Sequence, residues 1–92
     1  MSDDTREAID ALECKSNPEH FERLFNFLVT RQATRMGLTP QQLYERVAEA
    51  DLRVVVRRAV DRFRPAAKSI TIYSSWWVRQ LVHRRLADRR SG

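Results

Sequence analysis

Residues 73 to 80 combine side chains of the types that recognise nucleic acids, in the order Tyr-Ser-Ser-Trp-Trp-Val-Arg-Gln. Flat aromatic rings stack on bases, a guanidinium group holds a phosphate, and a side-chain amide hydrogen-bonds to the edge of a base. Neighbouring residues of a helix point about 100° apart, so two adjacent tryptophans cannot both enter one narrow core stripe. We therefore expect one of the two indoles, Trp76 or Trp77, to be free for contact with another molecule.

A helix that starts in this segment has two different faces. The apolar face consists of Tyr73, Trp77, Val78, Leu81, Val82 and Leu86. The opposite face consists of Trp76, Arg79, Gln80, His83, Arg84 and Arg90. On the second face, Gln80 and His83 are one turn apart and suit base edges, whereas the arginines suit phosphates and the indole suits an unstacked base. The alternative interpretation is that both tryptophans belong to the core and that the arginines form a solvated surface.

Charge is distributed unevenly along the 92 residues, whose formal net charge is +5. Residues 1 to 51 contain 10 acidic and 6 basic side chains, a net charge of −4, whereas residues 52 to 92 contain 2 acidic and 11 basic side chains, a net charge of +9. A surface of this charge density attracts phosphate backbones by releasing their counterions, without any sequence preference. The second half of the chain is therefore expected to contact nucleic acid, with a merely soluble basic surface as the alternative.

Helical patterns cover most of the chain, which contains only two glycines. A first helix is expected over residues 4 to 14, with a thin apolar face that makes it marginal by itself. Asn17 is expected to cap a second helix that begins at Pro18 and reaches about Arg35. The core stripe of that second helix consists of Phe21, Leu24, Phe25 and Leu28.

A third helix is expected to start at a capping box formed by Thr39 and Gln42. Apolar residues at three- and four-residue spacing then predict a single helix of about 24 residues, which ends shortly after the last of them. Those apolar residues are Leu52, Val55, Val56, Ala59, Val60 and Phe63. Either Ser69 or Thr71 is expected to cap the last helix, which runs to about Arg89.

These patterns predict an all-α fold, a compact bundle of three to four helices. Residues 1 to 15 form a marginal N-terminal helix in this prediction, and residues 16 to 92 form a single domain, a size that can bury a modest core. No run approaches the roughly 20 apolar residues of a membrane helix, and the acidic start does not resemble a secretory signal. Because a single cysteine excludes an internal disulfide, we expect a soluble, cytoplasmic protein with no membrane partner.

The stretch from Ala59 to Arg90 resembles region 2 of bacterial sigma factors of the primary, housekeeping type. Members of that family typically show an Ala-Val-x-x-Phe helix end, a short loop, and then Thr-Tyr-Ala-x-Trp-Trp-Ile-Arg-Gln leading into a basic helix. The chain matches this pattern at Ala59, Val60, Phe63, Tyr73, Trp76, Trp77, Arg79 and Gln80. The resemblance implies a helical domain that binds core RNA polymerase and recognises the minus-10 element of promoter DNA.

The resemblance also implies roles for individual residues. Trp76 and Trp77 lie at the upstream edge of the melted promoter segment, and Gln80 reads a duplex base pair. Tyr73 belongs to the pocket for a flipped non-template adenine, whose extrusion must be offset by stacking and hydrogen bonds. The full set of residues expected to bind DNA is Lys68, Tyr73, Trp76, Trp77, Arg79, Gln80, His83 and Arg84.

Two stretches depart from the pattern of the family. Lys68, Ile70 and Ile72 stand where housekeeping members carry further aromatic residues, so the flipped-base pocket is expected to be reduced and strand melting does not follow from the resemblance. The polymerase-binding helix of the family is acidic and contains glycines, whereas the corresponding residues 47 to 55 keep acidic residues but have no glycine. Only Asp51 is carried over as a residue expected to contact the beta-prime clamp helices of the polymerase.

The length of the chain leaves several kinds of sigma-like protein open. There is no room for the downstream helix-turn-helix domain that reads the minus-35 element, so a full-length housekeeping factor is not expected. A stand-alone or split sigma-like factor, an accessory regulator and an excised domain all fit the length. A second sigma-like polypeptide or an anti-sigma factor are further partners, and a sigma mimic that binds only protein is an alternative function.

A different DNA-binding interpretation uses residues 31 to 46, whose spacing resembles a helix-turn-helix motif. Ala33 lies four residues before Gly37, and Leu43 lies ten residues after Ala33. Arg46, however, stands where such motifs place an apolar residue. An ordinary capped junction between two helices explains the same residues.

Catalysis finds little support in the sequence. Cys14 and His20 are by type a nucleophile and a base, but they fall in different expected helices and have no oxyanion-supplying glycine loop beside them. One cysteine and two histidines spread along the chain also lack the spacing of a zinc site. We therefore expect no enzymatic activity, no cofactor and no bound metal.

Overall fold

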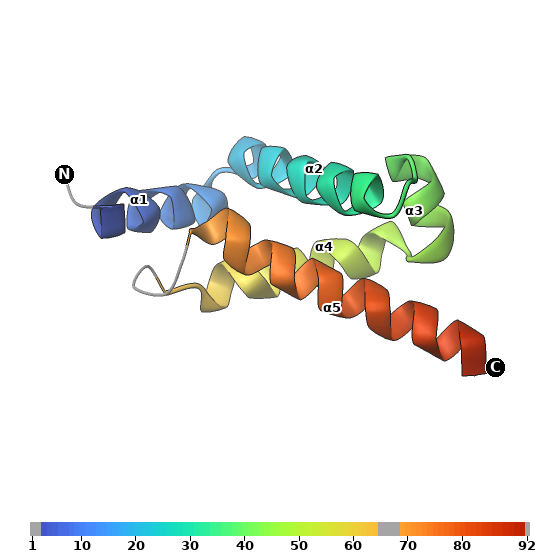
Figure 1. Ribbon diagram of the computed structural model, residues 1–92. Coiled ribbons are helices and arrows are strands. Elements are labelled where there is room, and N and C mark those ends of the chain that lie inside the picture. Colours follow the sequence, from blue (N-terminus) through green and yellow to red (C-terminus); the bar gives the residue numbers. More distant parts are fainter. Residues whose placement is uncertain (1–2, 65–68, 92) are drawn as a thin grey trace.

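The computed structural model describes residues 3 to 64 and 69 to 91, with side chains at residues 9 to 64 and 69 to 88. These residues form five α-helices and no strand (Figure 1). In chain order the helices are α1 (Asp3–Ser16), α2 (Pro18–Arg35), α3 (Pro40–Arg46), α4 (Glu49–Arg62) and α5 (Ile70–Ser91). The all-α prediction is confirmed, whereas the predicted number of three to four helices is too small.

The ends of α2 follow from local chemistry. The side-chain oxygen of Asn17 accepts a hydrogen bond from the Glu19 amide at 3.0 Å, and Pro18 occupies the first helical position. Beyond the other end, Gly37 has a φ of +71°, a backbone conformation that residues with a side chain rarely adopt. The predicted boundaries of α2 are therefore confirmed, and α1 extends slightly beyond the predicted residues 4 to 14.

The single helix predicted to follow Thr39 is in fact two helices. Its capping box is present: the Thr39 hydroxyl accepts a hydrogen bond from the Gln42 amide at 3.1 Å, and the Gln42 side chain accepts one from the Thr39 amide at 2.9 Å. The helix nevertheless ends at Arg46, because the backbones of Val47 and Ala48 are not helical: their ψ angles are 120° and 135°. The prediction of one continuous helix is wrong at this point.

The break between α3 and α4 has a geometric reason. Leu43 and Val47 precede α4, Leu52 lies within it, and all three are buried in the same core. Leu43 and Leu52 are nine residues apart, and at about 100° per residue they would point to opposite sides of a straight helix. The two non-helical residues 47 and 48 change the direction of the helix axis between α3 and α4. Side chains on both sides of the break can therefore enter the core.

One core receives buried side chains from all five helices. Its fully buried large side chains include Phe25, Leu28, Val29, Leu43, Val47, Leu52, Val56, Val60, Val78 and Val82. From α1 it receives Ala11 and Cys14. The predicted core stripe of α2 is confirmed, as is the burial of the expected α4 residues, except that Val55 is only half-buried.

The helices form an elongated body with principal extents of 48, 23 and 21 Å. In Figure 1, α1 and α2 follow one another along one side, α3 turns at the far end, α4 returns, and α5 crosses the bundle with its last turns extending past the other helices. α5 packs against α4 and α2. Within the described parts of the chain, no helix combines the length and the apolar character needed to cross a membrane.

Candidate nucleic-acid interface

α5 is oriented by a row of buried residues. The row consists of Ile70, Ser74, Val78 and Val82, which recur every four residues. At the start of the helix, the Ser69 hydroxyl accepts a hydrogen bond from the Ile72 amide at 3.1 Å, so Ser69 is the cap that the sequence predicted as Ser69 or Thr71. Because the row determines how α5 is rotated, the residues opposite to it face solvent.

The two adjacent indoles have different surroundings. Trp77 is half-buried, and its ring lies 6.1 Å from the ring of Tyr73 and 6.3 Å from that of Trp76, measured between centroids. The guanidinium of Arg62 lies 5.7 Å from the Trp77 ring centre, and Tyr73 packs edge-on against Phe63 at 5.7 Å. Trp76 stands at the outer end of this aromatic row and is 55% exposed. One indole of the pair thus faces solvent, as the helical spacing predicted.

On one side of Trp76 lies a hollow that we call the basic hollow, with a volume of about 510 Å³. It is formed between α2 and α5 by Arg31, Arg35, Ile72, Tyr73, Ser75, Trp76 and Arg79. Among the described residues, none of its three arginines forms an ion pair. Two aromatic rings and three unpaired guanidinium groups therefore line one concave surface.

On the other side of Trp76 lies a second hollow of about 550 Å³, which we call the α4–α5 groove. It is formed by Asp51, Val54, Val55, Arg58, Trp76, Trp77, Gln80, Leu81, Arg84 and Arg85. Asp51 and Arg85 form an ion pair across it, with 3.1 Å between the carboxylate and the guanidinium. The acid that was expected to contact a polymerase is therefore already paired within the molecule. Within the described residues, Arg58 and Arg84 have no ion pair.

The structure brings together six of the eight residues that were expected to bind DNA. Tyr73 and Arg79 line the basic hollow, Trp76 lines both hollows, and the α4–α5 groove is lined by Trp77, Gln80 and Arg84. His83 is exposed on α5 but lines neither hollow. Lys68 lies outside the described residues.

Arg31 and Arg35 join the candidate site from α2. In the sequence they belong to the segment that resembles a helix-turn-helix motif. Their spacing of four residues places them on the same face of a helix, which was a signal for a shared role. Nothing in the sequence indicated that this face would stand beside Trp76. That juxtaposition results from the packing of α2 against α5.

The helix-turn-helix interpretation gains little from the structure. α3, which would be the reading helix, has only 7 residues. The side chain of Gln42, one of the two glutamines that would read bases there, is engaged in the capping box with Thr39. Only Gln41 remains exposed and without such a bond in the described structure, so this segment presents little that could read a base edge.

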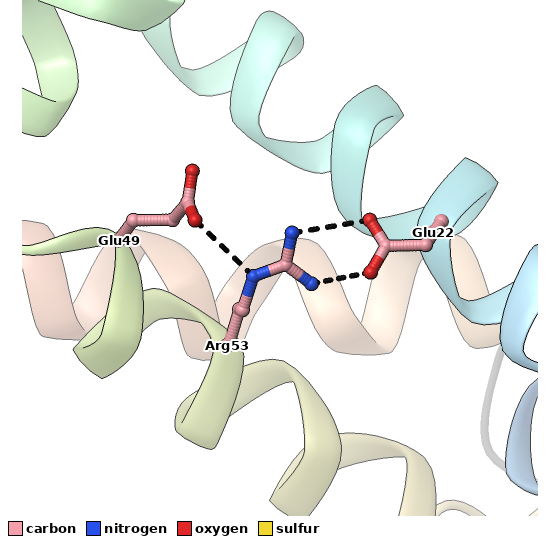
Figure 2. A network of polar contacts seen from close by, with 3 residues as sticks. All are labelled: Glu22, Glu49 and Arg53. Atoms are coloured by element: carbon pink, nitrogen blue, oxygen red, sulfur yellow. Dashed lines mark hydrogen bonds and ion pairs between the residues drawn. The ribbon is translucent and has the colours of Figure 1, made fainter.

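Arg53 joins α2 to α4 (Figure 2). Its guanidinium donates two hydrogen bonds to the carboxylate of Glu22, one of them 3.1 Å long, and its Nε lies 3.4 Å from Glu49. The same guanidinium lies 4.4 Å from the ring centre of Phe25. The hydrogen bonds from Arg53 lower the pKa of Glu22 below its ordinary value.

This lowered pKa predicts how acid affects stability. Because the folded-state pKa of Glu22 lies below its unfolded value, the stabilisation is present above the ordinary carboxyl pKa of about 4.3 and is lost as the pH falls through the folded-state pKa. We expect the melting temperature of a Glu22→Gln variant to fall less than that of the wild type when the pH is lowered through this range. Circular dichroism melts at a series of pH values measure the difference.

The control for the acid experiment is Glu45→Gln, because Glu45 is exposed and has no ion pair within the described chain. This variant should keep the pH dependence of the wild type. Parallel pH profiles for the wild type and Glu22→Gln would contradict the role given to the Glu22–Arg53 pair.

Cys14 and His20, the two residues considered for catalysis, are engaged in contacts within the helices. Cys14 is buried, and this burial, followed by the nearby carboxylates of Asp10 and Glu13, raises the pKa of its thiol and so disfavours the reactive thiolate. The Nε2 atom of His20 contacts the Glu13 carboxylate. Among the residues described, no group of three or more histidines, cysteines or acidic residues is placed to hold a metal.

Comparison of the chain with protein-family models, with curated proteins and with solved structures finds no match. What the interface can do therefore follows from its own residues. It offers rings for stacking, guanidinium groups for phosphates and an amide for a hydrogen bond, side by side along one helix. This set of groups suits a nucleic acid with at least one unstacked base.

Proposed function

We propose that the protein is a small sigma-like transcription factor, stand-alone, split or accessory, that binds promoter DNA near the minus-10 element together with core RNA polymerase. The observation that carries the DNA-binding part is the position of Trp76. Its exposed ring lines two hollows, and each hollow holds arginines that form no ion pair within the described part of the chain. An unpaired base stacks on such a ring while the guanidinium groups hold the phosphates next to it.

The basic hollow favours a single DNA strand over an intact duplex as its ligand. Bases in a duplex are stacked on one another and show only their edges, whereas an unpaired base presents a flat face to an aromatic side chain. Trp76 and Tyr73 both line this hollow, together with Arg31, Arg35 and Arg79. Gln80, on the other side of the indole, is exposed and suited to a base edge next to the unpaired segment.

The polymerase part of the proposal rests on the sequence resemblance of residues 59 to 90 to region 2 of sigma factors. Asp51 was the residue carried over for this contact, and it is paired with Arg85. In our proposal Asp51 exchanges this partner when the polymerase binds. Both side chains of the pair are partly exposed, and ion pairs in such positions contribute little stability, so the exchange costs little.

Photocrosslinking from single positions tests this function. A photoreactive amino acid is placed at position 76, 80, 41 or 27, and each protein is mixed with core polymerase and promoter DNA. We expect positions 76 and 80 to crosslink to DNA bases of the minus-10 element, and Trp76 to reach the non-template strand. Phe27 is an exposed aromatic residue on α2 that lines neither hollow, so position 27 should give no DNA crosslink.

The possible outcomes separate the alternatives. Crosslinks from position 76 to polymerase or to an added anti-sigma factor, without any to DNA, would replace the proposal by a mimic that binds only protein. DNA crosslinks from Gln41 but not from positions 76 and 80 would favour the helix-turn-helix interpretation. Equal DNA crosslinking from positions 27 and 76 would remove the assigned site.

A further inference from the structure

The outer face of α1 is apolar and acidic. Ile9 and Leu12 are 44% and 63% exposed, although both are large aliphatic residues. Asp10 and Glu13 are exposed beside them, and residues 3 to 16 contain five acidic and two basic residues. The inner face of the same helix is already used, because Ala11 is part of the core. Exposed apolar side chains with acidic neighbours give the outer side of α1 a surface on which a partner can dock.

The α4–α5 groove has the complementary character. Val54 is 52% exposed at its edge, and Val55 and Leu81 lie half-buried within it. Arg58 and Arg84 line the same groove and, within the described residues, have no ion pair. The groove therefore offers aliphatic contacts together with positive charge. Its aliphatic residues suit a side chain such as leucine better than they suit a base or a phosphate.

The α1 helix of a molecule cannot occupy the groove of that same molecule. α1 packs against α2 and α4, with Ala11 and Cys14 in the core. Figure 1 shows α1 at the end of the bundle where α5 begins, whereas the groove residues Gln80 to Arg85 lie in the half of α5 that leads away from that end. The two complementary surfaces can meet only between two molecules.

We propose that the protein self-associates, with the outer face of α1 from one copy docked in the α4–α5 groove of a second copy. Leu12 and Ile9 contact Val54, Val55 and Leu81, and Asp10 and Glu13 lie next to Arg58 and Arg84. Each copy has one helix to donate and one groove to fill. Two copies therefore form either a reciprocal pair or the first step of a longer chain. Because the contact joins opposite charges, salt weakens it.

Self-association regulates DNA binding if the function proposed above is right, since Trp76 lines both the α4–α5 groove and the basic hollow. A copy whose groove is filled has one side of this indole covered. The associated form is then the one that does not bind DNA, and single-stranded DNA shifts the protein towards the monomer. Self-association itself does not depend on the proposed function, because it is measured without DNA.

Sedimentation velocity at increasing protein concentration tests the contact. We expect the wild type to associate, and we expect Leu12→Lys and Val54→Glu each to weaken the association by at least about tenfold, since each removes an aliphatic contact and opposes the charge of the other surface. Phe27→Glu is the matched control, because Phe27 is about as exposed as Val54 but belongs to neither surface, and it should associate like the wild type. Circular dichroism melts verify that all variants are folded.

Mixing the two variants identifies the surfaces that meet. Leu12→Lys retains an intact groove and Val54→Glu retains an intact α1, so an equimolar mixture should form a one-to-one complex at a concentration at which each variant alone is monomeric. A wild type that stays monomeric at millimolar concentration would overturn the proposal. Variants that associate like the wild type, or a mixture that stays monomeric while the wild type associates, would overturn it as well.

Adding a single-stranded oligonucleotide to the associated wild type separates the two proposals. Dissociation into a monomer bound to DNA supports both of them. Self-association that persists unchanged in the presence of bound DNA would remove the regulatory role, and self-association without any DNA binding would remove the proposed function but keep the contact.

Discussion

Replacing Trp76 by alanine is expected to weaken the binding of single-stranded DNA by about fivefold to 150-fold, because stacking of a base on an aromatic side chain contributes about 1 to 3 kcal/mol. The ring is more than half exposed and lies outside the core, so its removal leaves the fold intact. Fluorescence anisotropy of a labelled oligonucleotide with the non-template minus-10 sequence measures the change. Unchanged affinity would contradict the stacking role of Trp76.

The dependence of affinity on salt distinguishes stacking from charge. Each arginine that neutralises a phosphate contributes about 0.7 to the slope of log affinity against log salt for a single strand. Arg35→Ala should therefore lower this slope, whereas Trp76→Ala should lower the affinity and leave the slope unchanged. Phe27→Ala removes an exposed ring that lies outside both hollows and should change neither quantity.

Replacing Phe25 by alanine is expected to lower the free energy of unfolding by about 3 to 5 kcal/mol, the usual cost of the cavity left by a buried phenylalanine. Phe25 is 0% exposed, stacks against Phe21 with ring centroids 6.4 Å apart, and has the guanidinium of Arg53 at 4.4 Å from its ring centre. A domain of this size has a total stability of about 5 to 15 kcal/mol, so the loss is a large part of it. Urea unfolding followed by circular dichroism measures the change.

Phe27→Ala is also the control for the stability experiment. Phe27 lies two residues further along the same helix, and its side chain is 51% exposed. Its replacement should change the free energy of unfolding by less than about 0.5 kcal/mol. If Phe25→Ala is already unfolded without urea, Phe25→Leu should lower the free energy of unfolding by a smaller amount that can still be measured. Equal effects at positions 25 and 27 would contradict the assigned core.

Features that depend on residues close together in the chain were predictable from the sequence. The caps at Asn17 and Thr39 are hydrogen bonds between residues two or three positions apart, so their chemistry is visible in the sequence itself. The buried stripe of α2 and the two faces of α5 follow from the helical period. For the same reason, one exposed indole was expected at the Trp76–Trp77 pair.

The break between α3 and α4 was missed although the sequence contains signs of it. The apolar pattern changes direction between Leu43 and Leu52, and the acidic residues Glu49 and Asp51 suit the first turn of a new helix. The prediction joined the two patterns because no proline or glycine separates them. Only the shared core requires both leucines to point inwards.

The sequence by itself determined most helix boundaries, the caps at Asn17 and Thr39, the apolar stripes and the aromatic and basic residues of α5, because these depend on neighbours in the chain. The break between α3 and α4 was decided by the shared core. Tertiary structure alone decided which helices lie beside α5. It placed Arg31 and Arg35 next to Trp76 and joined Asp51 to Arg85. Such contacts depend on how distant apolar faces pack together, and no local spacing encodes that packing.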